Sequence, residues 1–156
     1  DPSTVVVAGR TFPRVRSYSM SQVFDFGYWL QTDHSLPPTR WRIYGKIADI
    51  VNPANTFVFI DEYQGSINDA ALATQCDGEA GSNTPGTPGI VDIPASYHGN
   101  SGGLSFADGH AEIHRWRGST ILTYNLPYAP PSAITTLSAA DLQDFNYLAN
   151  NTTVQE

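Results

Sequence analysis

The stretch LSFADGHAEIHRW, residues 104–116, constrains the fold more than any other part of the chain. Apolar and polar residues alternate on both sides of Asp108 and Gly109, which is the period of a β-strand and not of a helix. An Asp-Gly pair favours a two-residue hairpin turn because glycine tolerates positive φ. The pattern therefore predicts an antiparallel β-hairpin that turns at Asp108-Gly109.

A second strand is predicted over residues 56–60, TFVFI, where β-branched and aromatic residues follow a turn at Asn52-Pro53. This buried strand would end at the acidic pair Asp61 and Glu62. Residues 41–50, WRIYGKIADI, indicate a further strand that passes into a turn, and the segment before them indicates short strands and loops.

A short helix is predicted near the C-terminus. Ser138 and Asp141 have the spacing of an N-terminal capping box, and three apolar residues after them share one helical stripe: Leu142, Phe145 and Leu148. Together these elements predict an α+β class, in which a loop-rich antiparallel sheet carries a β-hairpin and a short C-terminal helix.

Length and local composition predict the domain organisation. A chain of 156 residues fits one globular domain, residues 1–156, which can bury a core without a disulfide framework. The single cysteine, Cys76, allows no intramolecular disulfide. Residues 76–90 are rich in Gly, Pro, Ser, Asn and Thr, so they predict a surface loop, and residues 151–156 predict a frayed tail.

Charge excludes one class of partner. The net charge is -7 and only 15% of residues are charged, so the chain lacks the clustered Lys and Arg that bind nucleic-acid phosphates. No apolar run of about eighteen residues is present, so the sequence predicts no membrane segment in this chain.

The second strand of the hairpin carries two of the four histidines. Alternation places His110, Glu112, His114 and Trp116 on one face, and Ala111, Ile113 and Arg115 on the other. Ala111 and Ile113 suit a core, so we expect the histidine face to meet solvent, a ligand or a partner. His110 and His114 would stand about 13 Å apart along a strand, too far to chelate one ion.

Three interpretations are open for His98, which precedes the hairpin. In the first, His98 and Asp108 hydrogen-bond each other and lock the loop onto the hairpin. The second is a metal site for Ca²⁺ or Zn²⁺, with candidate ligands His98, Asp108, His110, Asp61 and Asp69. In the third, the site is catalytic and uses His98, Asp108, Asp61 and Glu62.

Several separated blocks resemble a known family. YHGNSGGLSFADGH places nine residues between His98 and Asp108-Gly109, which resembles the signature of the H-X9-DG group of prepilin-type proteins. Three blocks are similar to that group in the same order, and the resemblance covers residues 14–117: RVRSYSM, NTFVFIDEYQGSIND and IPASYHGNSGGLSFADGHAEIHRW.

The resemblance implies a pseudopilin-like protein of type II secretion or of a pilus-like assembly. Such proteins have an N-terminal hydrophobic helix followed by a globular α+β domain outside the inner membrane. The chain starts at Asp1 and lacks that helix and its cleavage motif, so it would correspond to the C-terminal globular part. An extracytoplasmic location follows, whether periplasmic, at the cell surface or secreted. The expected partners are other pseudopilins or secretion-apparatus proteins, met through a polar face of the sheet, and calcium in the related pseudopilins favours a metal site.

Two other functions remain open. One is a secreted hydrolase of glycans or esters that uses a metal-activated water or a carboxylate pair. The other is a carbohydrate-binding module with a glycan as partner, which would need exposed, coplanar Trp or Tyr rings. The pseudopilin-like interpretation differs from the first of these because it predicts no turnover.

Overall fold

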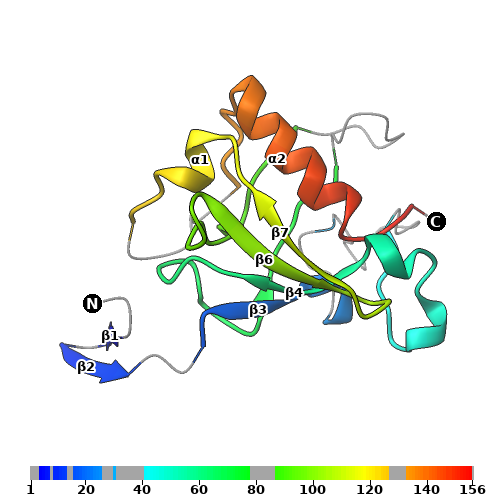
Figure 1. Cartoon of the computed structure of the whole chain (residues 1–156), viewed down its shortest axis with the longest axis horizontal. Helices are drawn as coiled ribbons and strands as arrows, with labels where there is room; N and C mark the ends of the chain where they lie inside the picture. The colour runs from blue at the N-terminus through cyan, green and yellow to red at the C-terminus, as the bar shows by residue number, and fades with distance from the viewer. Residues whose placement is uncertain are drawn as a thin grey trace.

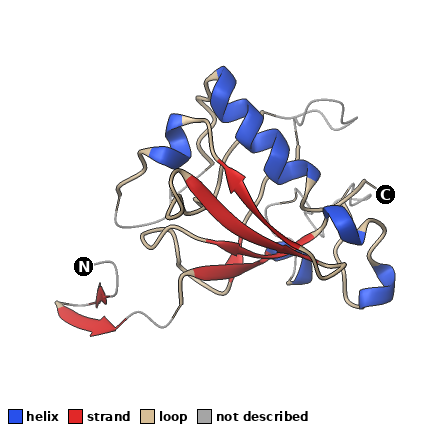
Figure 2. Cartoon of the chain, viewed as in Figure 1, coloured by secondary structure: helices blue, strands red, loops and turns tan. Residues whose placement is uncertain are grey.

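The computed structural model describes residues 4–7, 9–13, 16–25, 30, 41–77, 87–126 and 133–155. A five-stranded, mostly antiparallel sheet has the order β5-β3-β4-β6-β7, and helix α2 lies across it (Figures 1 and 2). The strands and α-helices of this part of the fold are β3 (Tyr18–Ser21), β4 (Phe57–Asp61), β5 (Ala71–Leu72), β6 (Ser101–Phe106), β7 (Ala111–Arg115), α1 (Ser119–Leu122) and α2 (Ala139–Asn150). The predicted α+β class is confirmed.

A separate two-stranded hairpin precedes the sheet. β1 (Thr4–Val7) pairs antiparallel with β2 (Arg10–Pro13), and the hairpin stands apart from the five-stranded sheet (Figure 1). Three short 3₁₀ helices follow along the chain: η1 (Gln22–Phe24), η2 (Ile47–Asp49) and η3 (Pro53–Asn55). η3 occupies the predicted turn before β4.

The hairpin β6–β7 forms where it was predicted, but its turn is longer than two residues. Phe106 N–H donates to the His110 carbonyl at 2.9 Å, and Gly109 N–H donates to the Phe106 carbonyl at 3.0 Å. The loop is therefore the three residues 107–109, with Gly109 at φ 96°. A three-residue loop places its glycine in the left-handed region, so the same Asp-Gly pair serves this turn as well.

The predicted alternation along β7 is correct, but the predicted buried face is wrong. Trp116 is 1% exposed and His114 is half-buried, whereas Ile113 is 62% exposed. α2 covers the histidine face: the Tyr147 ring stacks on His114 at a centroid distance of 3.4 Å. Trp116 Nε1 donates to the Ala95 carbonyl at 2.8 Å. Tertiary packing of α2 decides the face, and the strand's own pattern does not contain that information.

The predicted C-terminal helix is α2, and its capping box is present. Ser138 accepts from Asp141 N–H, while the Asp141 carboxylate accepts from Ser138 N–H. The same carboxylate accepts from Thr120 N–H at 2.8 Å, so one side chain serves the starts of both helices. Gly118 makes this possible, because a Cβ there would lie 2.6 Å from Asp141 Cα.

Two predictions, one about the C-terminal tail and one about residues 41–50, are wrong. Residues 151–155 are not frayed: Thr152 and Thr153 are buried, and Phe57 N–H donates to the Asn151 carbonyl at 2.8 Å. Residues 41–50 form no extended strand, because Trp41 makes a single bridge to Gln155 and η2 follows. Instead, Arg42 N–H donates to the Val154 carbonyl of the tail, and Tyr44 N–H donates to the Val23 carbonyl of η1.

The predicted surface loop over residues 76–90 is buried at its described ends. Cys76, Asp77 and Ile90 are each at most 2% exposed, and residues 78–86 lie outside the described part. Ile90 forms a bridge to Ile134 through two backbone hydrogen bonds. The turn-rich composition therefore does not keep the ends of this segment at the surface.

Candidate functional site

A cluster at the end of β4 joins the motif histidine to the sheet. His98 Nε2 lies 3.1 Å from Asp61 Oδ2, and the same oxygen accepts from Gly103 N–H at 2.8 Å. His98 N–H also donates to the Ser101 carbonyl at 3.0 Å. Strand β4 supplies the carboxylate, β6 the amide and the turn before β6 the imidazole, so the cluster fastens this turn to the sheet.

A second pair lies in the hairpin loop. His110 Nδ1 and His110 N–H both approach Asp108 Oδ1, at 2.6 and 3.1 Å. The imidazole also stacks on Phe106, with ring centroids 4.2 Å apart. The backbone N–H of His110, followed by its imidazole, lowers the pKa of Asp108 because both stabilise the carboxylate.

The predicted hydrogen bond between His98 and Asp108 is wrong, because each residue has a different partner. Strand β6 separates them, and its six residues span roughly 17 Å at about 3.3 Å per residue. A spacing of nine residues therefore places the histidine and the Asp-Gly turn at opposite ends of one strand. The partner of His98 is Asp61, which is 37 positions earlier in the sequence.

The candidate metal ligands do not meet in one place. His98 and Asp61 form one pair, Asp108 and His110 form another, and Asp69 Oδ1 accepts from Ala71 N–H at 2.9 Å before β5. Within the described ranges, no group of three or more His, Cys, Asp or Glu side chains is arranged to hold a metal ion. The predicted set is thus divided over three places.

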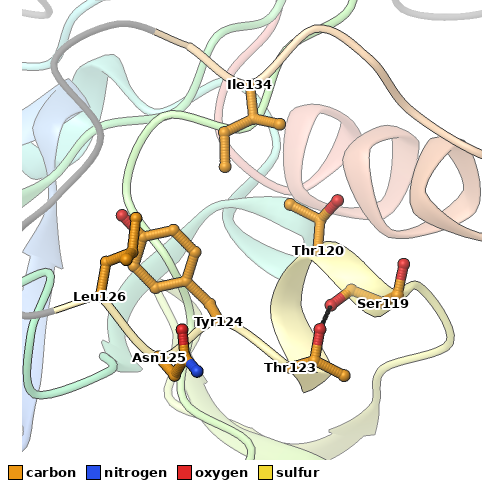
Figure 3. A pocket seen from close by; sticks show the side chains of 7 residues that line it. All are labelled: Ser119, Thr120, Thr123, Tyr124, Asn125, Leu126 and Ile134. Atoms are coloured by element: carbon orange, nitrogen blue, oxygen red, sulfur yellow. Dashed lines mark hydrogen bonds between the residues drawn. The ribbon is translucent and has the colours of Figure 1, made fainter.

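Two well-formed surface hollows lie among the described residues, and the candidate catalytic residues line neither. The first, of about 350 Å³, is shown in Figure 3 and is lined by Ser119, Thr120, Thr123, Tyr124, Asn125, Leu126 and Ile134. The second, of about 420 Å³, is lined by Phe24, Tyr44, Gly45, Lys46, Ile47, Ile50, Val58, Phe106, Ala107 and Gly109. Neither lining contains a carboxylate or an imidazole.

Glu62, predicted as a catalytic candidate, is buried in the core. It is 0% exposed, and neither carboxylate oxygen has a hydrogen-bond partner of good geometry among the described residues. Its pKa is raised to about 7, mainly because burial disfavours the charged form; the nearby Asp92 also raises the pKa, whereas the hydroxyls of Ser19 and Ser66 and the charge of Arg16 lower it. Buried in this way, Glu62 has no route to a substrate.

Asp92 is a buried acid that the sequence reasoning missed. Burial raises its pKa to about 6, against the effect of Ala73 N–H, which donates to Asp92 Oδ2 at 2.7 Å. The signal was present in the sequence, because Asp92 interrupts the apolar run IVDIP. An acid flanked by β-branched residues is a candidate for burial.

A chain of aromatic contacts ties α2 to β7. The Tyr147 hydroxyl donates to the Glu112 carboxylate, and the Tyr147 ring stacks on His114. Burial, followed by the Glu112 carboxylate, raises the pKa of Tyr147. Burial lowers the pKa of His114, which Asp144 and Glu112 partly offset. These contacts are packing of the helix on the sheet.

The sheet face opposite α2 exposes apolar side chains instead of the expected polar ones. Tyr18, Phe59 and Ile113 are 52%, 43% and 62% exposed. Tyr18 and Phe59 meet edge to face, with an interplanar angle of 84°, so they offer no coplanar platform for a sugar. Trp41 and Trp116 are buried, and Trp29 lies outside the described residues. We call Tyr18, Phe59 and Ile113 the open face.

In the part of the chain that the structure describes, no helix has the length and apolarity to cross a membrane. Comparison of the chain with models of protein families, with curated proteins and with solved structures finds no match.

Proposed function

We propose that the chain is the globular part of an extracytoplasmic, pseudopilin-like protein that acts as a structural and interaction domain without turnover. The observation that supports the proposal is the structural role of the residues that carry the family resemblance. His98 and the Gly103 amide both bind the Asp61 carboxylate. The Asp108-Gly109 turn closes the hairpin between β6 and β7. These residues hold the fold together.

The geometry around His98 supports a fastening role better than a catalytic one. Asp61 Oδ2 already accepts from a strand amide, and neither hollow is lined by His98 or Asp61. A general base needs a substrate within hydrogen-bond reach, and substrate pockets are concave. Neither hollow therefore brings a substrate within reach of His98 or Asp61.

The open face supplies the surface that an interaction domain needs. Exposed aromatic and aliphatic residues that gather on one side of a sheet mark a contact surface more often than isolated ones do. Tyr18 and Phe59 lie on adjacent, central strands, because β3 pairs with β4. We therefore assign the contact with assembly partners to this face.

The test is photo-crosslinking in a bacterium that makes the full-length protein. A photoreactive phenylalanine analogue replaces Phe59, and a matched control replaces Gln143, which is exposed on α2. We expect Phe59 to yield adducts that mass spectrometry identifies as pseudopilins or secretion-apparatus proteins, with none at Gln143. Equal labelling at the two positions, or adducts with unrelated proteins only, would contradict the proposal.

A second measurement addresses turnover. The purified chain is assayed on glycan and ester substrates beside His98→Ala. We expect the same background rate for both proteins. A rate that His98→Ala abolishes while the variant remains folded would make the hydrolase the better interpretation.

A further inference from the structure

Strand β7 is the last strand of the five-stranded sheet, with β6 on one side only. Its pairing with β6 shows which backbone groups face outward. Phe106 N–H bonds to the His110 carbonyl, and Trp116 N–H bonds to the Asn100 carbonyl, so the even-numbered residues of β7 face β6. Hydrogen-bonded and non-hydrogen-bonded pairs alternate in an antiparallel ladder. The N–H and C=O groups of Ala111, Ile113 and Arg115 therefore point to the outer edge.

Among the described residues, the outer edge of β7 has no neighbouring strand. No hydrogen bond within these residues joins the six outward-pointing backbone groups to another element. Ala111, Ile113 and Arg115 are all exposed. Proteins usually protect such an edge with a proline, a bulge, charged side chains (lysine above all) or a covering loop. β7 carries no proline or lysine, its two charged residues, Glu112 and Arg115, are of opposite sign, and its register with β6 is regular from Ser101↔Arg115 to Ser105↔Ala111.

We propose that β7 pairs antiparallel with β7 of a second copy of this chain, about a two-fold axis at Ile113, and so joins the two sheets into one. In this register Ile113 faces Ile113 of the second copy, and Ala111 faces Arg115. All three are hydrogen-bonded pairs, because their backbone groups point outward. Every outward N–H and C=O of both strands is then satisfied, which no other centre on β7 achieves.

The side chains of β7 are complementary to themselves in the same register. Glu112 of one copy lies opposite His114 of the other, which places a carboxylate beside an imidazole twice across the axis. The two Ile113 side chains, now 62% exposed, cover each other on the open face. Arg115 meets the small Ala111, so no like charges face each other. This self-complementary pattern of side chains argues for a second copy as the occupant.

The interface is short, so the dimer should be weak by itself. A five-residue strand pair buries less than the roughly 1,000 Å² of total surface that a stable interface needs. We therefore expect a concentration-dependent equilibrium, which a tethered or assembled protein would shift towards the dimer. The experiment must trap the register as well as measure mass.

Cysteine trapping tests the register. Residues that face each other in a hydrogen-bonded pair have Cα atoms about 5.5 Å apart, within the range of a disulfide. Ile113→Cys should therefore give a disulfide-linked dimer under mild oxidation. Ala111→Cys or Arg115→Cys alone should not, because each position lies roughly 13 Å from its own copy, whereas a mixture of the two should cross-link. The native Cys76 is buried and gives little background.

A proline variant tests the backbone pairing. Ile113→Pro removes an N–H that points outward, so it leaves the bonds between β6 and β7 intact. Ile113→Thr keeps that N–H and is the matched control. Sedimentation equilibrium over a range of concentrations should show association for the native chain and Ile113→Thr but not for Ile113→Pro, with melting curves to show that each variant is folded. A native chain that is monomeric at every concentration, or single-cysteine variants that all cross-link equally, would overturn the proposal.

Discussion

At the scale of single residues, Asp61 is the side chain on which the candidate site depends. It accepts from the Gly103 amide and pairs with His98, while being only 20% exposed. His98 is 55% exposed, so its half of the interaction is screened by water. Loss of the carboxylate leaves a partly buried amide without an acceptor, whereas loss of the imidazole leaves both other groups paired.

Asp61→Ala is therefore expected to destabilise the chain more than His98→Ala does. An unpaired amide costs about 1–3 kcal/mol, so we expect the free energy of unfolding to fall by about that amount for Asp61→Ala. Urea unfolding at pH 7 measures the difference. Asp49→Ala, at an exposed carboxylate of η2, is the control and should change the free energy by less than about 0.5 kcal/mol. A larger loss for His98→Ala than for Asp61→Ala would contradict this role.

The pairing of His98 shows where sequence reasoning stops at this scale. The chemistry of His98, Asp61 and Asp108 was recognised from their residue types, but the partners were not. Asp61 and His98 meet because β4 and β6 pair, with Ile60 opposite Leu104, and no local pattern encodes that register. Asp108 bonds to His110, two residues away, because a tight turn places these neighbours together.

At the scale of elements, the sequence correctly predicts those strands and helices whose formation depends mainly on local sequence. The hairpin, β4 and α2 each have a strong pattern of their own, and each is present. The face of β7 that is buried, and the docking of residues 151–155, depend instead on contacts with α2 and residues 41–44. Such contacts can override a pattern that fits two faces equally well.

The junction of α1 and α2 gives a prediction at this scale. Gly118→Ala would place a Cβ 2.6 Å from Asp141 Cα. The backbone must move to relieve this clash. The shift should also disturb the amides of residues 117 and 118, which both donate to the buried Asp144. We expect a loss of about 1–3 kcal/mol in thermal or urea unfolding. Gly45→Ala is the matched control, because a Cβ there has no neighbour within 4 Å, and equal effects of the two substitutions would refute the argument.

At the scale of the whole molecule, one core spans the chain from Val23 to Ala149, and Thr152 and Thr153 in the tail beyond α2 are buried as well. Thr153 Oγ1 donates to the Arg42 carbonyl at 2.6 Å, and Arg42 N–H donates to the Val154 carbonyl at 3.0 Å. The tail thus links the sheet to residues 41–44.

Removal of residues 152–156 should therefore destabilise the whole molecule. Arg42 loses the acceptor of its N–H and the donor to its carbonyl, and Trp41 loses its bridge to Gln155, so we expect a fall of at least about 2 kcal/mol in the free energy of unfolding. Calorimetry should show one transition at a lower temperature. Removal of Glu156 alone is the control. An unchanged transition after removal of all five residues would mean that the tail does not contribute.

The buried acids give the last prediction, because they make the stability of the whole molecule depend on pH. The pKa of Glu62 is about 7 in the folded chain and 4.5 in the unfolded chain, so the folded state holds its proton more tightly. The stabilisation is complete below about pH 4.5 and is lost as the pH rises to about 7. A difference of this size corresponds to about 3 kcal/mol. Asp92 acts in the same direction between 3.8 and about 6.

Glu62→Gln separates this effect from all others, because the amide is close to the shape of the protonated acid but cannot ionise. We expect the native chain to lose stability between pH 5 and 8, and Glu62→Gln to lose less, so that the variant is relatively more stable at pH 8 than at pH 5. Urea unfolding at a series of pH values measures both slopes. Asp49→Asn, at an exposed carboxylate of η2, should keep the native slope. Parallel curves for the native chain and Glu62→Gln would show that Glu62 is ionised in the folded state at neutral pH, and its burial would then need a compensating cation instead of a proton.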